Sequence, residues 1–348
     1  MSERRMPLLP RQRQRRKLTE WEKLGINMLK TLIAIPIVML IAALVLIACE
    51  ISDGGKHWNP KPKNPPNATV TGMRKVSRIA GRGKLGDIPA GRPFYDTPRP
   101  HHGIVPYGGH GVIRTCLYPG QVALTFDDGP WYWTDRILDE LAKHDAKATF
   151  FVTGYNKMLG RRIDEEGGSM YAEMLRRMVF EGHQVGSHTW THQHLANLSS
   201  EERFNEVLYN EVALNGIINM FPTYMRPPFA EWRDPGLQRD LGALGYHVVL
   251  YNVDTKDYSH NSEAEIEAAA RTFDDAVDGR GNGSYVVLCH DIREWTAKVL
   301  VPHMLWTLED RGYRAVTLGE CLGDPPENWY RDPSRTWTEA EGEMEMEG

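Results

Sequence analysis

The chain has 348 residues, of which 41% are hydrophobic and 25% are charged. This composition is typical of a globular protein and excludes collagen-like and low-complexity chains. Residues 1–30 carry nine Lys or Arg and three Glu, whereas the whole chain has a formal net charge of -5, so the remainder is acidic. An acidic body argues against a nucleic-acid-binding domain, and we expect no nucleic-acid partner.

Residues 31–49 form an uncharged, apolar run that lies between Lys30 and Glu50. At about 1.5 Å per residue, a helix of this length just crosses a hydrocarbon core of roughly 30 Å. The basic residues precede the run, so the positive-inside rule predicts a single-pass type II membrane protein whose remaining chain is lumenal or extracellular. A cleaved signal peptide, a lipobox ending at Cys49 and a buried soluble helix are the alternatives.

Residues 50–110 are rich in Pro and Gly and have no sustained periodicity, which predicts an extended stem. Residues 326–348 end in a Glu-rich tract, which predicts a solvated, disordered tail. A folded domain is therefore expected at residues 111–325, after a basic cytoplasmic tail (residues 1–30), a transmembrane signal anchor (residues 31–49) and the stem.

Strand and helix patterns alternate through this expected domain. Strands are predicted at residues 121–126, 148–152, 183–187, 223–226, 247–253, 284–290 and 313–316. Helices are predicted at residues 134–144, 171–181, 199–219, 236–244, 263–277 and 296–311, and Ser199 or Ser200 is suited to cap the third of them. Such alternation predicts an α/β fold with a parallel sheet, in the form of a barrel.

Conspicuous polar residues follow the predicted strands. Asp127 and Asp128 follow the first strand, and His188 and His192 follow the third. Further along the chain, successive strand ends carry Arg226, then Asp254 and Asp257, then His290. In parallel α/β barrels the carboxyl ends of the strands carry the chemistry, so we expect these side chains to meet.

His188 and His192 are four residues apart, so one helical turn would present both on one face. Two imidazoles and one carboxylate make a three-ligand metal site that keeps a position open. Asp127 and Asp128 are adjacent, and a metal on one of them would leave the other free as a base. Taken singly, the His pair reads as a polar turn and the Asp-Asp-Gly-Pro segment as a surface turn; their placement at successive strand ends favours a site.

The cysteines and the Asn-x-Ser/Thr triplets depend on the compartment. Cys289 lies in an apolar strand pattern and is expected to be a buried free thiol. Cys116 and Cys321 lie near the two ends of the expected domain, and in an oxidising compartment we expect them to form a disulfide. In a secretory lumen the triplets would accept glycans at Asn67, Asn197 and Asn282.

Five segments contain the polar residues that follow the predicted strands: residues 125–130 (TFDDGP), 188–192 (HTWTH), 226–229 (RPPF), 254–258 (DTKDY) and 288–291 (LCHD). In this order they resemble the motifs of the polysaccharide deacetylases (carbohydrate esterase family 4, the NodB homology domain), and the surrounding sequence is most similar to fungal chitin deacetylases. The resemblance covers about residues 115–325 and implies a distorted (β/α)7-8 barrel.

The resemblance also implies a role for each residue. Asp128, His188 and His192 would hold a divalent metal, commonly zinc, with cobalt as an alternative. Asp127 would be the general base and Arg226 its partner, while His290 would be the general acid, oriented by Asp257. The main-chain N–H of Phe229 would stabilise the oxyanion, and Tyr258 and Leu288 would line the acetyl pocket. Trp131 either stacks on substrate sugars or packs beneath the loops.

The sequence departs from the family pattern in its substrate-facing wall. Phe229-Ala230 replaces the usual Tyr-Gly, Glu231 adds a negative charge, and Tyr251 and Tyr258 stand where Trp is common in bacterial members. None of these changes touches the expected metal ligands, so we expect a metal-dependent hydrolase that removes N-acetyl groups from a β-1,4-N-acetylglucosamine polymer such as chitin. An acetyl xylan esterase and a non-catalytic carbohydrate-binding relic are the alternatives.

Overall fold

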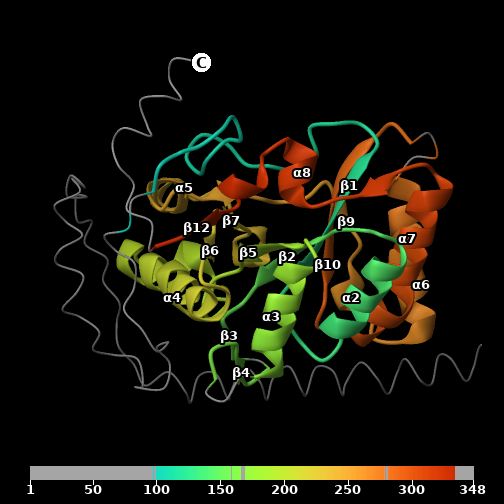
Figure 1. Cartoon of the computed structure of the whole chain (residues 1–348), viewed down its shortest axis with the longest axis horizontal. Helices are drawn as coiled ribbons and strands as arrows, with labels where there is room; N and C mark the ends of the chain where they lie inside the picture. The colour runs from blue at the N-terminus through green and yellow to red at the C-terminus, as the bar shows by residue number, and fades with distance from the viewer. Residues whose placement is uncertain are drawn as a thin grey trace, which may run out of the picture. The chain divides into compact units, whose positions relative to one another are not determined.

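The computed structural model describes residue 97 and residues 99–333, apart from residues 158, 166–168, 278 and 280. Eight parallel strands form a curled sheet with the order β8-β7-β5-β2-β1-β10-β9, and β11 also pairs with β1 (Figure 1). The strands are β1 (Gln121–Asp127), β2 (Thr149–Val152), β5 (Gln184–Ser187), β7 (Tyr224–Met225), β8 (His247–Val248), β9 (Val253–Asp254), β10 (Ser284–His290) and β11 (Arg314–Ala315).

Helices alternate with these strands, as the sequence predicts. Their bounds are α2 (Thr134–Lys143), α3 (Met170–Phe180), α4 (Ser200–Ile218), α5 (Pro235–Ala243), α6 (Glu263–Ala276), α7 (Val301–Asp310) and α8 (Leu318–Leu322). Ser199 caps α4 in a capping box with Glu202, which satisfies main-chain N–H groups that the first turn leaves open. The predicted helix at residues 296–311 begins instead with a π-helical turn, Thr296–Leu300, before α7.

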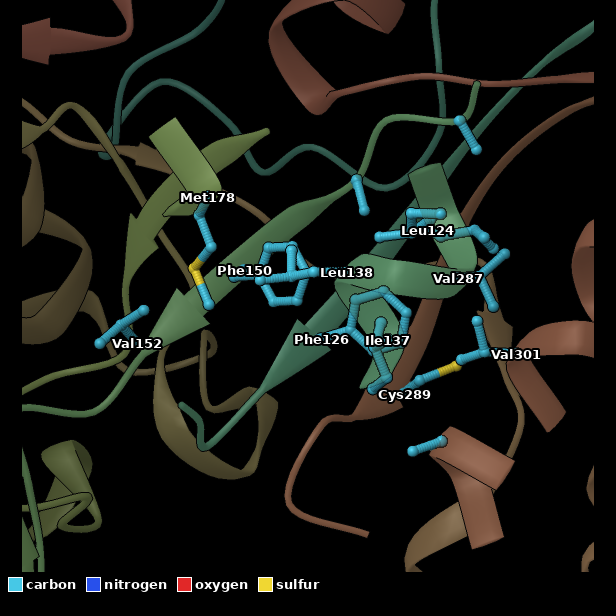
Figure 2. Close-up of a cluster of buried hydrophobic side chains, with 14 of the residues drawn as sticks. Leu124, Phe126, Ile137, Leu138, Phe150, Val152, Met178, Val287, Cys289 and Val301 are labelled. Carbon is cyan, nitrogen blue, oxygen red and sulfur yellow. The ribbon is translucent and has the colours of Figure 1, made fainter. Parts of the chain in front are cut away.

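Side chains alternate across the sheet, so its two faces pack against different cores. On β1, Leu124 and Phe126 point to the outer face, where they pack with Ile137 and Leu138 of α2 and with side chains of α3 and α7 (Figure 2). Ala123 faces inward, in a second core that includes residues of α8. By the same alternation, Thr125 and Asp127 share the inner face of β1, and this places the carboxylate inside the curl.

The predicted strand at residues 247–253 is wrong as a single element. Its first part is β8, which pairs with β7, and its last part continues into β9, which pairs with β10. Among the described residues no ladder joins β8 to β9, so the sheet is an open, curled half-barrel rather than a closed barrel. The intervening residues run from one edge of the sheet to the other, because Val249 N donates to Met225 O of β7 and Asn252 N donates to Val286 O of β10.

Two short antiparallel pairs lie outside the main sheet. β3 (Tyr155–Asn156) pairs with β4 (Arg161–Arg162), and β6 (Phe221–Pro222) pairs with β12 (Tyr330–Arg331). Neither pair was predicted from the sequence.

Residues 99–113 pack along α5 and β8. Gly108 N donates to Tyr246 O at 2.6 Å, and a Cβ on Gly242 would lie only 2.2 Å from Gly108 O, so the two main chains approach closely. Arg99 forms a two-pronged ion pair with Glu211 of α4, with both N–O distances 2.7 Å. These contacts make the segment part of the folded domain's packing.

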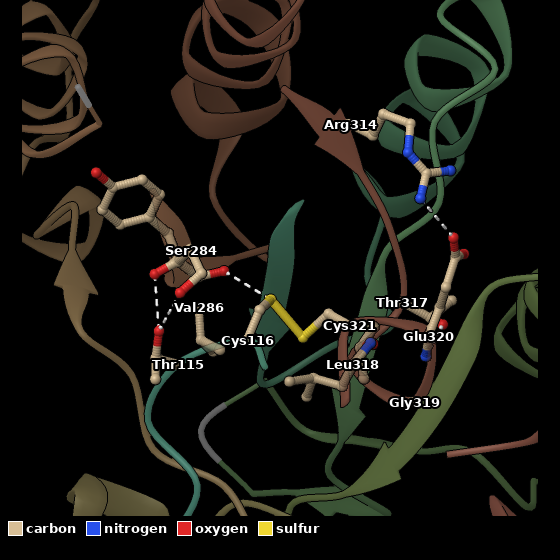
Figure 3. The surroundings of a disulfide bond; sticks show 12 residues. Thr115, Cys116, Ser284, Val286, Arg314, Thr317, Leu318, Gly319, Glu320 and Cys321 are labelled. Atoms are coloured by element: carbon tan, nitrogen blue, oxygen red, sulfur yellow. Dashed lines mark hydrogen bonds and ion pairs between the residues drawn. A yellow bond between two sulfur atoms is a disulfide. The ribbon is translucent and has the colours of Figure 1, made fainter. Parts of the chain in front are cut away.

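Cys116 and Cys321 form a disulfide (Figure 3). Cys116 precedes β1 and Cys321 lies in α8, 205 residues further along the chain. The bond closes a long loop, which restricts the unfolded chain more than it restricts the folded one. Cys289 is a buried free thiol, as the sequence predicts.

The expected localisation is corrected by the described helices. Among the residues that the structure describes, no helix combines the length and the apolarity needed to span a bilayer. The 19 residues of α4, for example, include Glu201, Arg203 and Glu211, as suits a helix packed on a sheet. This finding overturns the prediction of a type II membrane protein with a lumenal or extracellular catalytic domain. The apolar run at residues 31–49 lies outside the described residues, as do residues 1–30 and Asn67.

Two of the predicted glycan acceptors, Asn197 and Asn282, are exposed. Glycosylation and the expected domain boundaries stay predictions.

The buried ion pair of Arg99 yields a stability prediction. Arg99→Ala should lower the free energy of unfolding by about 3–5 kcal/mol, because the Glu211 carboxylate, whose side chain is 0% exposed, would lose its charged partner. Urea denaturation measures the change. Arg271→Ala is the matched control, since its ion pair with Glu267 is 68% and 67% exposed and should change stability by less than about 1 kcal/mol. Equal effects of the two substitutions would contradict the prediction.

Candidate metal centre and active site

The structure brings the predicted polar residues together at the carboxyl edge of the sheet. Asp127 ends β1 and is the register partner of His290, which ends β10. His188 directly follows β5, and Arg226 directly follows the neighbouring β7. Asp257 begins a 3-10 turn, Asp257–Ser259, just after β9. Parallel strands therefore converge these groups in space although they are far apart in sequence.

Asp128, His188 and His192 form a group that could hold a metal ion. One ligand atom from each lies within 4.8 Å of the other two. His192 Nε2 is 3.1 Å and His188 Nε2 is 3.5 Å from Asp128 Oδ1. A carboxylate with two imidazole nitrogens is a donor set that suits a catalytic divalent ion such as zinc.

The surroundings of the three ligands fit a cation. His188 Nδ1 lies 2.7 Å from Arg226 O, so Nδ1–H donates to that carbonyl and Nε2 is left facing Asp128. Burial lowers the pKa of His188 to about 4, which keeps the ring neutral, the form that binds a metal. Asp128 Oδ1 is buried and accepts no well-formed hydrogen bond from the described residues. A bound cation would satisfy this buried oxygen.

Asp127 and Arg226 form a buried ion pair beside this group. Arg226 Nη1 donates to Asp127 Oδ1 at 2.7 Å, and the two residues are 1% and 4% exposed. The other carboxylate oxygen, Oδ2, lies 3.8 Å from His188 Nε2 and faces the ligands. The guanidinium thus fixes one oxygen of Asp127 and leaves the second directed at the candidate metal centre.

His290 is held by Asp257 through two hydrogen bonds. Its ring Nδ1 and its main-chain N each lie 2.7 Å from an oxygen of the Asp257 carboxylate, and Thr296 Oγ1 also donates to that carboxylate at 2.7 Å. Burial opposes the charged imidazole, but the Asp257 carboxylate and its hydrogen bond outweigh it and raise the pKa of His290 to about 9. His290 therefore carries a proton at neutral pH, with Nδ1 bonded to Asp257 and Nε2 as its second donor.

The residues predicted to line a substrate pocket have different surroundings. The Phe229 ring meets the His192 ring at a centroid distance of 4.8 Å, and the Tyr258 ring meets the His290 ring at 5.3 Å. Leu288 is buried on β10. Trp131 stacks on Tyr171 at 5.9 Å, so packing on the protein accounts for at least one face of its ring.

Several supporting residues were missed by sequence reasoning. Glu206 of α4 accepts hydrogen bonds from both N and Oγ1 of Thr191, between the two His ligands, and Glu206 O accepts from Trp190 N. Arg161 of β4 donates to Asp128 O at 2.7 Å. The detectable signal was weak: a carboxylate such as Glu206 on the buried face of a helix breaks the apolar pattern.

Comparison with known proteins decides the family. Residues 116–249 match the polysaccharide deacetylase family. Over 220 residues the chain is 45% identical to a chitin deacetylase from Colletotrichum lindemuthianum, a match that covers 63% of this chain and 86% of that relative. The chain belongs to the polysaccharide deacetylase family.

Further relatives of this polysaccharide deacetylase agree. The solved structure of the chitin deacetylase from Colletotrichum lindemuthianum superposes with a TM-score of 0.62 at 43% identity, over 67% of this chain and 99% of that one. A chitin deacetylase from Arthroderma benhamiae is 40% identical over 233 residues, which are 67% of this chain and 59% of that relative. The family resemblance drawn from the five motifs is confirmed.

The support that Glu206 gives to the ligand loop of this deacetylase can be measured. Glu206→Ala should weaken zinc binding by about 10–100-fold, because Thr191 would lose the two hydrogen bonds that fix the loop between His188 and His192. Isothermal titration calorimetry on the metal-free protein measures the dissociation constant. Glu202→Ala, which removes only the capping box of the same helix, should leave zinc affinity unchanged. Similar zinc affinities for the two variants would refute the role of Glu206.

Proposed function

We propose that this polysaccharide deacetylase hydrolyses the N-acetyl groups of a β-1,4-linked N-acetylglucosamine polymer such as chitin and releases acetate. The observation that carries the proposal is the convergence of three arrangements at one edge of the sheet: the Asp128, His188 and His192 group, the Asp127–Arg226 pair and the His290–Asp257 pair. The chitin deacetylases among the relatives support the same substrate class.

Asp128, His188 and His192 would hold the divalent ion, zinc or cobalt. Such an ion would supply Lewis-acid polarisation of the acetyl carbonyl and promote ionisation of the attacking water. The protein's own part is to keep the His188 imidazole neutral and aimed. The hydrogen bond from His188 Nδ1 to Arg226 O and the burial of that ring serve this purpose.

Asp127 acts as the general base in this proposal. Its Oδ2 takes a proton from the water that attacks the acetyl carbon, while Arg226 holds Oδ1 and orients the carboxylate. The main-chain N–H of Phe229 donates to the oxygen that becomes negative in the tetrahedral intermediate. Tyr258 and Leu288 enclose the acetyl methyl group.

His290 acts as the general acid. Because Asp257 raises its pKa to about 9, the imidazolium is present at neutral pH and can deliver its Nε2 proton to the departing amine. An amine is a poor leaving group unless it is protonated, so a charged imidazole suits amide cleavage. An ester would depend less on this proton.

Acetate release by the full-length chain tests the proposal. With zinc or cobalt added, we expect release from N-acetylglucosamine oligomers that a chelator abolishes, measured beside acetylated xylan. Asp127→Asn should keep its bound metal and lose about 10²–10⁴-fold in turnover. Release of acetate from xylan alone would contradict the proposal and favour an acetyl xylan esterase. No release from either substrate by folded, metal-loaded protein would favour a non-catalytic carbohydrate-binding relic.

The pH dependence of activity tests the assignment of His290 as the general acid. Activity should fall as the pH rises through the pKa of His290, because the protonated form is the one that donates. Asp257→Asn removes the charge that raises this pKa, so the alkaline limb of kcat/KM should move down by about one pH unit or more. A limb that stays in place in the variant would show that another group supplies the proton.

A further inference from the structure

Three side chains at the edge of the candidate metal centre form a continuous chain of contacts. Glu231 Oε1 lies 2.7 Å from His194 Nδ1, and Glu231 Oε2 accepts a hydrogen bond from Ala196 N at 3.1 Å. The His194 ring stacks on the Phe229 ring, with a centroid distance of 3.7 Å and an angle of 11°. The Phe229 ring in turn meets the candidate ligand His192 edge-on at 4.8 Å.

These contacts join two separate loops. His192, His194 and Ala196 lie in the segment after β5, whereas Phe229 and Glu231 lie in the segment after β7. Glu231 and the stacked rings therefore tie the loop that carries a candidate metal ligand to the loop that carries the candidate oxyanion donor.

Both loops have main-chain conformations that side chains disfavour. His192 has a φ of 56°, Phe229 of 58° and Ala230 of 55°. A residue other than Gly in this left-handed region costs on the order of 1–3 kcal/mol and persists only where neighbouring contacts hold it. A bulky residue such as Phe229 is a particular outlier there.

Burial in the core does not hold the Phe229 and His194 rings in place. Phe229 is 54% exposed and the His194 side chain is 52% exposed, so neither ring is locked in a core. The His194–Glu231 hydrogen bond, the stack and the edge-on contact with His192 restrain the two rings, and Ala196 N ties Glu231 to the same loop. The Glu231 carboxylate therefore helps to hold the two loops together, in addition to placing a negative charge beside the site.

We propose that Glu231 and His194 are positioning residues that hold Phe229 and His192 in their left-handed conformations; this inference rests on the proposed deacetylation. These contacts of Glu231 and His194, called the clamp below, aim the main-chain N–H of Phe229 at the developing oxyanion. They also keep Nε2 of His192 directed at Asp128. The clamp affects transition-state stabilisation through Phe229 and metal affinity through His192. It leaves the binding of substrate in the ground state unchanged.

Three variants and one control test the clamp. Glu231→Ala removes both hydrogen bonds, and His194→Ala removes the stack. Glu231→Gln keeps the geometry, because its amide N–H₂ can donate to Nδ1 of the other His194 tautomer while its oxygen accepts from Ala196 N. His144→Ala is the matched control, since His144 Nδ1 also lies 2.7 Å from a carboxylate, Glu309, but at the far end of α2.

We expect Glu231→Ala and His194→Ala each to lower kcat by about tenfold and to weaken zinc binding by about tenfold, with KM within about twofold of the wild type. Glu231→Gln should stay within about threefold of the wild type in both quantities, and His144→Ala should match the wild type. Zinc affinity is measured by calorimetry on metal-free protein, and thermal unfolding of the same samples verifies that each variant is folded.

Other results would overturn the clamp. These are kcat and zinc affinity within twofold of the wild type in both Ala variants, a raised KM with unchanged kcat, or equal losses in His144→Ala. If the wild type releases no acetate from any substrate, the proposed function fails, but the zinc affinities of the variants still decide whether the clamp exists.

Discussion

The buried guanidinium of Arg226 is the interaction on which the rest of the site depends. Its nitrogens donate to Asp127 Oδ1 and Thr125 Oγ1 of β1, and to the carbonyl oxygens of Val249 and Leu250 in the segment that crosses between the sheet edges. Its own carbonyl oxygen accepts a hydrogen bond from His188 Nδ1. One residue thus orients the candidate base, fixes the tautomer of a candidate ligand and links the end of β7 to β1 and to the segment between β8 and β9.

This buried ion pair is favourable only because its polar groups have hydrogen-bond partners. Taking a carboxylate and a guanidinium out of water is costly, and their attraction offsets that cost only with good geometry and further hydrogen bonds. Arg226 meets both conditions, and its guanidinium also lies 4.4 Å from the centre of the Phe151 ring. The inner face of the sheet can therefore carry charge at its carboxyl edge while its other positions, such as Ala123 and Val286, pack in an apolar core.

The ligand loops follow a second rule, that unfavourable main-chain conformations need external support. Asp128, Thr189 and His192 all have positive φ values. Each lies next to a contact from elsewhere in the fold: Arg161 of the β3–β4 hairpin reaches Asp128 O, and Glu206 of α4 holds the loop through Thr191. The loops that carry the three candidate metal ligands are thus supported by a helix and a hairpin from elsewhere in the fold. This support explains how short polar loops can present three ligands in one place.

Sequence reasoning succeeded where the signal is local and failed where it is not. Long apolar runs such as β1 and β10 show their periodicity in a few residues, so their bounds were predictable within a residue or so. The division of residues 247–253 was not predictable, because the same extended pattern pairs with β7 at one end and with β10 at the other. The two-residue strands β3, β4, β6 and β12 carry no period at all. The expected membrane topology rested on residues 31–49 and on the basic residues that precede them, and the helices among the described residues 99–333 do not support it.

The sequence by itself determined which chemical groups the site contains and their order, because each group sits at a strand end that a local pattern marks. Only the tertiary structure decided how these groups are aimed. Arg226 reaches Asp127 across 99 residues of chain, and Glu206 reaches Thr191 across 15. Such contacts depend on strand register, helix packing and side-chain tautomers, which no short stretch of sequence encodes. The Glu231–His194–Phe229 contacts belong to this second class, since they arise only where two loops from neighbouring strands meet.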